Sequence, residues 1–172
     1  MTDPALVPEL LVRDLDASLW FWRDLCGFGV RYERPDERFA YLELEGAHVM
    51  LEQAGVGRNW VAGVLEAPFG RGVNLQISVG DAAGLAGRLE AAGIRLFMAV
   101  ETKWYPVGDA EAGVQQFVVA DPDGYLLRFQ TSLGRRTPDP TAGWVAESRA
   151  QGRVKVSLRD ATRARVRCRC RG

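Results

Sequence analysis

Two segments of the chain, 14–27 and 81–93, carry apolar residues every three or four positions, the spacing of one face of an amphipathic helix. An aspartate opens each segment, where its side chain can accept hydrogen bonds from the first free backbone N–H groups. A glycine closes each segment, where a left-handed residue often ends a helix. The two aspartates lie 67 residues apart and the two glycines 66, so the sequence predicts a repeated helix. The apolar stripes are Leu15, Leu19, Trp22 and Leu25, and then Leu85, Leu89 and Ala92.

Stretches typical of β-strands surround each predicted helix in the same order, one before it and three after it. The clearest alternation, at 72–79, places aliphatic residues on one face of a strand and polar residues on the other. Because the whole unit occurs twice, we predict an α+β fold of two βαβββ modules, at about 5–54 and 70–132. The predicted strands are 6–13, 30–33, 39–44 and 47–53, and then 72–79, 94–100, 115–120 and 125–130.

The connection from Glu101 to Gly113 breaks this repeat, because the first module has no insertion of that length. A long loop in a compact domain usually has a function or is disordered. We therefore expect residues 101–113, which include Trp104 and Tyr105, to form a lid over a cleft.

The net charge of zero conceals two parts of opposite charge. Residues 1–134 hold 11 basic and 19 acidic residues, a balance of −8 that should attract cations and repel nucleic acid. Residues 135–172 hold 11 basic and 3 acidic residues, a balance of +8, with little to form a core. We predict a folded domain at 1–134 and a disordered basic tail at 135–172. The alternative for the tail is a nucleic-acid-binding arm.

The composition narrows the class of protein further. A chain that is 47% hydrophobic and 26% charged is typical of a globular domain. It has no apolar run near the roughly 18 residues that span a bilayer, and its start lacks the basic and apolar regions of a secretion signal. Three cysteines are too few for a disulfide framework. We expect a cytoplasmic protein with neither membrane nor nucleic acid as a partner.

Two stretches resemble a known family. Residues 12–22 (VRDLDASLWFW), followed by LCGF at 25–28, resemble the opening of the glyoxalase/bleomycin-resistance proteins, the vicinal oxygen chelate superfamily. Residues 121–129 (DPDGYLLRF) resemble the hairpin that closes these proteins. The resemblance covers about residues 5–132 and implies two βαβββ modules that form a curved mixed sheet around a cleft, usually within a homodimer. Because members include lyases, dioxygenases, isomerases and drug-binding proteins, it does not fix the function.

The resemblance also implies four positions where enzymes of the superfamily hold a divalent metal with His or Glu. In this chain they are Val7, Glu52, Asn74 and Arg128. Glu52 is a good ligand, whereas Val7 has no donor atom and Asn74 offers a neutral amide oxygen. Arg128 places a permanent cation where a carboxylate would have to lie. A catalytic transition metal typically needs about three protein ligands, so we expect no metal and no cofactor.

Other catalytic sets have little support in the sequence. His48, the only histidine, would share a strand face with Met50 and Glu52, so a His–Glu acid/base pair is conceivable. The alternative is a partly exposed histidine beside the turn at Gly46. Cys26, at the end of a predicted helix, is expected to be a packed thiol.

The missing metal ligands and Val7-Pro8 at the first strand make the resemblance closer to bleomycin-resistance proteins than to glyoxalase I. It therefore implies a non-catalytic homodimer that sequesters a cationic aromatic antibiotic or similar small molecule between its subunits. The acidic folded part and the aromatic residues outside the helical stripes agree with this, because aromatic faces stack on planar rings and hold cations. The alternative function is a metal-dependent lyase or dioxygenase of the same superfamily.

Within the cleft we expect Glu52 and Arg128 to form an ion pair in place of the metal, across two subunits of the dimer. Asn74 and Gln76 would add amide hydrogen bonds. In the alternative, Arg128 extends to solvent from a strand end, and the aromatic residues are ordinary strand residues or loop anchors. The predicted ligand-binding residues are Phe39, Tyr41, Glu52, Trp60, Asn74, Gln76, Trp104, Tyr105 and Arg128.

Overall fold

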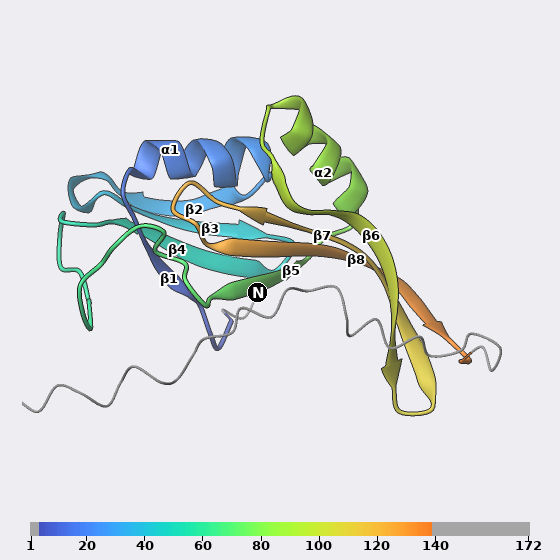
Figure 1. The fold of residues 1–172 in the computed structure, drawn as a ribbon. Helices are drawn as coiled ribbons and strands as arrows, with labels where there is room; N and C mark the ends of the chain where they lie inside the picture. The colour runs from blue at the N-terminus through green and yellow to red at the C-terminus, as the bar shows by residue number, and fades with distance from the viewer. Residues whose placement is uncertain (1–3, 139–172) are drawn as a thin grey trace, which may run out of the picture. The chain divides into compact units, whose positions relative to one another are not determined.

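The computed structural model describes residues 4–138, which form two βαβββ modules (Figure 1). The first module consists of β1 (Glu9–Val12), α1 (Leu15–Leu19), η1 (Trp20–Leu25), β2 (Gly29–Arg34), η2 (Pro35–Glu37), β3 (Phe39–Leu44) and β4 (Ala47–Gln53). The second consists of β5 (Asn74–Ser78), α2 (Ala82–Ala91), β6 (Leu96–Val107), β7 (Ala110–Ala120) and β8 (Leu126–Arg136).

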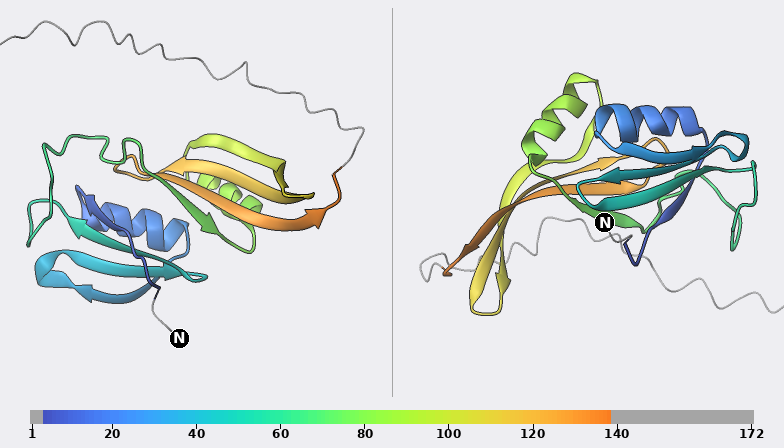
Figure 2. Two further views of the ribbon diagram at one scale, coloured as in Figure 1. Left: turned by 90° about the horizontal axis from the view of Figure 1, so that it is seen from below. Right: turned by 180° about the vertical axis from the view of Figure 1, so that it is seen from behind.

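Each module has its own four-stranded mixed sheet, and the two helical segments lie on the same side of the sheets (Figures 1 and 2). Sheet A has the order β1-β4-β3-β2, and sheet B has the matching order β5-β8-β7-β6. In both sheets the first strand of the module runs parallel to the last, and the remaining pairs are antiparallel. The predicted fold is confirmed, with one sheet in each module.

The first helical segment begins where the sequence predicts. The side chain of Asp14 accepts hydrogen bonds from the backbone N–H groups of residues 16 and 17, and Gly27 has a φ of +89° beyond the end. The predicted stripe omits Phe21, which is nevertheless buried beside Trp22. The reason is that η1 is a π-helix, whose wider turn brings both neighbouring aromatic side chains toward the sheet.

The second helix, α2, also has the predicted cap. Asp81 accepts a hydrogen bond from the N–H of Gly84, and a Cβ at Gly84 would lie 2.1 Å from an Asp81 carboxylate oxygen. Leu85 and Leu89 are buried as predicted, and Ala82 and Ala86 are buried beside them. The predicted end of the stripe is wrong, because Ala92 follows the helix and is exposed.

The predicted lid at 101–113 is wrong. These residues are the outer halves of β6 and β7, a hairpin that turns at Gly108 and extends away from α2 (Figure 1). β7 continues to pair with β8 along this outer part, with Glu111 opposite Arg136. β6 is an edge strand, so Pro106 can lie within it without removing a hydrogen bond that the sheet needs.

One hydrophobic core includes residues from both modules. Two buried aspartates of the hairpin between β7 and β8 join the modules by hydrogen bonds. Asp121 accepts from Trp22 Nε1 at 3.1 Å, and Asp123 accepts from Arg13 Nε at 2.7 Å and from Ser18 Oγ at 3.4 Å. The DPDG motif therefore links the second module to the first helical segment.

Within residues 4–138, no helix is long and apolar enough to cross a membrane. The division into a domain at 1–134 and a tail at 135–172 stays a prediction. β8 extends as far as Arg136, and the disorder predicted for the rest of the tail concerns residues 139–172, which lie outside the described residues.

Candidate functional site

A hollow of about 620 Å³ lies on the face of sheet A that is turned away from the core, and we call it the carboxylate hollow. Alternation along β3 and β4 places Phe39, Tyr41, Met50 and Glu52 on this face, because Ala40, Leu42, Val49 and Leu51 pack into the core. The hollow is lined by Glu9, Tyr32, Arg34, Glu37, Phe39, Met50, Glu52, Gly57, Arg58 and Trp60.

A wall of three aromatic rings crosses this face. Tyr32 of β2 stacks on Phe39 with 5.9 Å between ring centroids, and on Tyr41 with 5.1 Å. Phe39 and Tyr41 are buried, whereas Tyr32 is 47% exposed. Tyr32 therefore presents an accessible aromatic surface on which a planar ligand could stack.

Two carboxyl groups lie together beside this wall. Glu52 is buried, and it lines the hollow together with Glu9 of the neighbouring parallel strand β1. Burial raises the pKa of Glu52, and the interaction with the carboxyl group of Glu9 raises it further. Neither carboxyl group forms an ion pair with any residue from 4 to 138. This end of the hollow therefore favours a cationic group.

The loop after β4 covers this end of the hollow. Gly57 has a φ of +69°, and a Cβ there would lie 3.3 Å from Glu52 Oε1. Arg58 of the same loop lies 4.4 Å from the ring centre of Trp60, and Arg34 lies 3.8 Å from that of Phe39. These two aromatic faces are thus already in contact with cations of the protein itself.

The donor set of the hollow does not fit a catalytic metal. Three glutamates line the hollow, but Glu37 forms an ion pair with Arg34 at 2.7 Å, and no histidine lines the hollow. Among the described residues, no group of three or more His, Cys, Asp or Glu side chains could hold a metal ion. Glu9 and Glu52 alone are fewer than the roughly three ligands that a catalytic transition metal needs.

His48 lies on the same strand face as Met50 and Glu52, as the alternation predicts. It shares a hydrogen bond with Tyr41, with 3.0 Å between Nδ1 and Oη. No hydrogen bond joins His48 to Glu52 in the described part of the chain, so the conceivable acid/base pair is not formed there.

Cys26 is buried, and burial raises the pKa of its thiol to about 12, which agrees with a packed, unreactive cysteine.

Five predicted residues lie on sheet B, outside the carboxylate hollow, and three of them are on β5 and β8. Arg128 donates a hydrogen bond to Gln76, which lies directly opposite it on β5, and Asn74 lies two residues earlier on the same strand. Arg128 and Glu52 do not form an ion pair within the described chain, so a pair across two subunits stays a prediction.

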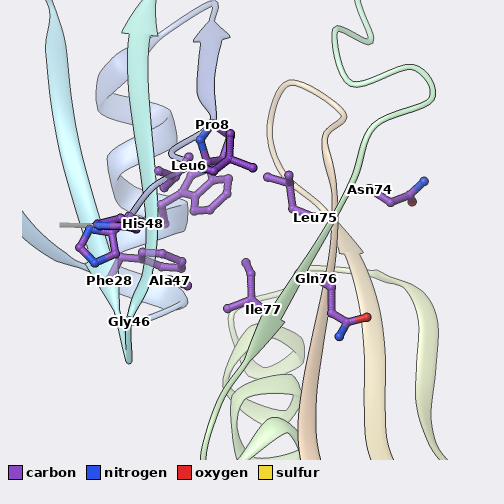
Figure 3. A pocket seen from close by; sticks show the side chains of 13 residues that line it. Leu6, Pro8, Phe28, Gly46, Ala47, His48, Asn74, Leu75, Gln76 and Ile77 are labelled. Carbon is purple, nitrogen blue, oxygen red and sulfur yellow. The ribbon is translucent and has the colours of Figure 1, made fainter. Parts of the chain in front are cut away.

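A cavity of about 280 Å³ lies between β5 and the first module (Figure 3). Leu75 and Ile77 point into this gap, with Leu6, Pro8 and Phe28 on its other side. Asn74 and Gln76 point the other way, as alternation along a strand requires. Polar residues also line the cavity, namely His48, Asn74 and Gln76, although the amide groups of Asn74 and Gln76 point away from its interior.

Trp104 and Tyr105 follow each other on β6 and therefore point to opposite faces of sheet B. Trp104 covers Gly113, and Arg136 lies 4.0 Å from its ring centre. Tyr105 Oη accepts a hydrogen bond from Gln116 Nε2 at 2.9 Å. The structure therefore brings together Phe39, Glu52 and Trp60 of the predicted site, with Tyr41 adjoining, and leaves the others on sheet B.

Seven residues of the hollow were absent from the predicted site. They are Glu9, Tyr32, Arg34, Glu37, Met50, Gly57 and Arg58. Glu9 could have been found from the sequence, since it alternates with Leu10 and Val12 at the start of a strand. The family position was instead assigned to Val7, which lies before β1. Glu9 lies near Glu52 because of the parallel register of β1 and β4, and this register could not be predicted from the sequence.

The raised pKa of Glu52 predicts a pH-dependent stability. The ordinary pKa of a glutamate is 4.5, and the pKa of Glu52 in the folded chain is higher, so the folded chain binds this proton more tightly than the unfolded chain does. The free energy of unfolding therefore falls as the pH rises from 4.5 through the pKa of the folded chain. Replacing Glu52 by Gln removes the cost of ionising a buried group. We expect the melting temperature of Glu52→Gln to exceed that of wild type by a few degrees at pH 7.5 and to match it near pH 4. Thermal unfolding at both pH values, with the exposed Glu90→Gln as control, measures this; an equal shift at both would contradict it.

Two βαβββ modules, with a hollow on the sheet of the first module, define the class of protein. The chain belongs to the glyoxalase/bleomycin resistance protein/dioxygenase superfamily, whose family model matches residues 5–129. None of the curated proteins matches this chain.

Several solved structures are similar to this chain. A glyoxalase/bleomycin resistance protein/dioxygenase superfamily member from Vibrio splendidus 12B01 is 43% identical, over 73% of this chain and 95% of that one, with a TM-score of 0.35. TioX from Micromonospora sp. ML1 is 25% identical, over 74% and 98%, with a TM-score of 0.58. A virulence protein from Salmonella typhimurium is 16% identical, over 76% and 98%, with a TM-score of 0.57, and this likeness concerns the fold alone.

Proposed function

We propose that this protein is a non-catalytic, bleomycin-resistance-like binding protein that sequesters a small cationic aromatic molecule such as an antibiotic. The proposal includes a homodimer in the cytoplasm, without a cofactor and without nucleic acid or membrane as a partner. The observation that carries it is the Glu9–Glu52 carboxyl pair beside the exposed ring of Tyr32.

The two features suit the two parts of such a ligand. The carboxyl groups have no ion pair within residues 4–138, so a cationic group of the ligand would supply the missing positive charge. Arg34 and Arg58 already lie over Phe39 and Trp60, so Tyr32 offers the open face for a planar ring. The acidic balance of residues 1–134 adds a long-range attraction for cations.

A thermal-shift screen of bleomycin-type, mitomycin-type and other cationic aromatic compounds tests the proposal, since a ligand of the native state raises the melting temperature. For a compound that binds, we expect the double variant Glu9→Gln/Glu52→Gln to weaken binding at least about tenfold, because it removes both charges that face the cation. Glu90→Gln, an exposed position on α2, is the matched control and should bind as wild type does. Unchanged affinity in the double variant would remove the basis of the proposal.

The alternative function is a metal-dependent lyase or dioxygenase of the same superfamily, in which Glu9 and Glu52 would be two of the metal ligands. Elemental analysis of purified protein separates the two functions. We expect the purified protein to contain less than one equivalent of transition metal, and we expect this content to be the same in the Glu9→Gln/Glu52→Gln variant. One equivalent of metal in wild type that is lost in the variant would favour the enzyme.

Sedimentation velocity tests the proposed homodimer, because it shows whether a particle contains one chain or two.

A further inference from the structure

The cavity between β5 and the first module, which we call the intermodule cavity, lies where two sheets end (Figure 3). β5 is the edge strand of sheet B. In sheet A, β4 begins at Ala47, but its pairing with β1 begins only at Met50, opposite Glu9. The preceding residue, Pro8, has no N–H group to extend this pairing. Residues 47–49 of β4 therefore line the cavity, together with Leu6, Pro8, Phe28, Leu75 and Ile77.

The walls of the intermodule cavity offer aromatic and aliphatic surface. Trp22 and Phe28 of the first module are buried and pack edge-to-face, with 5.1 Å between their ring centroids. The Nε1 of Trp22 already donates to Asp121, so the polar atom of this indole has its partner. Leu75 and Ile77 point into the gap from the second module. A molecule in the cavity would therefore contact two aliphatic side chains and an aromatic pair, the usual lining of a small-molecule site.

The polar groups of the intermodule cavity favour an uncharged molecule. No Asp, Glu, Lys or Arg lines it within residues 4–138, whereas three glutamates and two arginines line the carboxylate hollow. The amides of Asn74 and Gln76 point away from its interior. His48 Nδ1 shares a hydrogen bond with Tyr41 Oη. A charged group moved from water into this cavity would have no partner of opposite charge, which is unfavourable.

The size of the cavity limits its ligand. Because a dry apolar cavity of about 150 Å³ holds benzene, a volume of about 280 Å³ suits roughly two fused rings. Leu6, which lines the cavity, is 84% exposed, so solvent reaches the cavity on this side. We infer that the intermodule cavity is a second binding site, which takes an uncharged bicyclic aromatic molecule. This inference does not rest on the proposed function, since the two sites share no lining residue in the described chain.

Two naphthalene probes that differ in charge test the inference. 2-Naphthalenemethanol is uncharged, and 2-naphthoate carries a carboxylate on the same ring system. We would measure both affinities by isothermal titration calorimetry in about 0.5 M sodium chloride, which screens the general repulsion between the acidic domain and an anion. Wild type is expected to bind 2-naphthalenemethanol at least about tenfold more tightly, because the charge of 2-naphthoate would be buried without a partner.

Substitutions that fill the cavity locate the probe. Leu75→Trp fills it from the second module and should weaken the binding of 2-naphthalenemethanol at least about tenfold, because the rings lose the space for their contacts. Ala47→Leu narrows it from the first module and should weaken binding in the same direction, which gives a second answer if Leu75→Trp does not fold. Ser78→Trp is the matched control, because it adds the same side chain to an exposed position of β5 outside the lining. Its affinity should equal that of wild type.

Three outcomes would overturn the inference. The first is that wild type binds both probes equally or does not bind 2-naphthalenemethanol. The second is that the filling variants fold, as circular dichroism shows, and keep the wild-type affinity. The third is that Glu9→Gln/Glu52→Gln weakens the uncharged probe as strongly as the filling variants do, which would place the probe in the carboxylate hollow. None of these results contradicts the proposed function, whose own test uses cationic compounds.

Discussion

Replacing Trp22 by alanine is expected to lower the free energy of unfolding by about 3–5 kcal/mol, the usual cost of removing a large buried aromatic side chain. Trp22 is fully buried and packs edge-to-face on Phe28, with 5.1 Å between ring centroids. Its Nε1 also donates to Asp121 of the other module. The substitution therefore opens a cavity in the shared core and leaves a buried carboxylate with one hydrogen bond fewer.

Denaturant unfolding followed by circular dichroism measures this loss. Trp22→Phe is the matched variant, because it keeps most of the ring volume and removes only the N–H donor. It should cost about 1–3 kcal/mol, the range for an unsatisfied buried partner. A loss below about 1 kcal/mol for Trp22→Ala would show that the two modules are not joined through this residue.

Replacing Arg13 by methionine is expected to cost about 2–3 kcal/mol, because it leaves the carboxylate of Asp123 buried without its ion-pair partner. The Asp123 side chain is 1% exposed, and its Oδ1 lies 2.7 Å from Arg13 Nε. Arg13 also donates to the carbonyl oxygen of Pro122. The cost lies below that of a fully buried pair because the Arg13 side chain is 56% exposed.

Arg23→Met is the control for this second variant. Arg23 also contacts a carboxylate closely, with 2.6 Å from its Nε to Asp24 Oδ1, but both side chains are more than 40% exposed. Its loss should stay within about 0.5 kcal/mol. A double-mutant cycle with Asp123→Asn isolates the pair, and single effects that simply add would mean that Arg13 and Asp123 do not stabilise the fold together.

The local sequence determined the elements whose ends carry their own signals. β3 and β4 begin and end at the predicted residues, because the turn at Glu45-Gly46 separates two stretches of strand-forming residues. Both helical segments have the predicted aspartate cap. The repeat of these signals, together with the closing DPDG hairpin, was sufficient to predict two βαβββ modules.

The outer hairpin of β6 and β7 could not be predicted in this way. Lys103, Pro106, Gly108 and Asp109 have the composition of a loop. They become strand and turn because β7 has β8 as a partner along its full length, and because β6 lies at the edge, where proline is tolerated. Pairing between distant segments decided this element against the local composition.

The candidate site was predicted only in part. Phe39, Tyr41 and Glu52 follow from the alternation of β3 and β4, which the sequence displays. Glu9 meets Glu52 only through the parallel register of β1 and β4, and Arg31 turns onto the aromatic wall only through a bulge. The sequence thus determined the repeat, the helix caps and the faces of the central strands, since these depend on neighbours along the chain. The tertiary structure alone decided which charges share the hollow, because register and bulges arise from contacts between strands that lie far apart in the sequence.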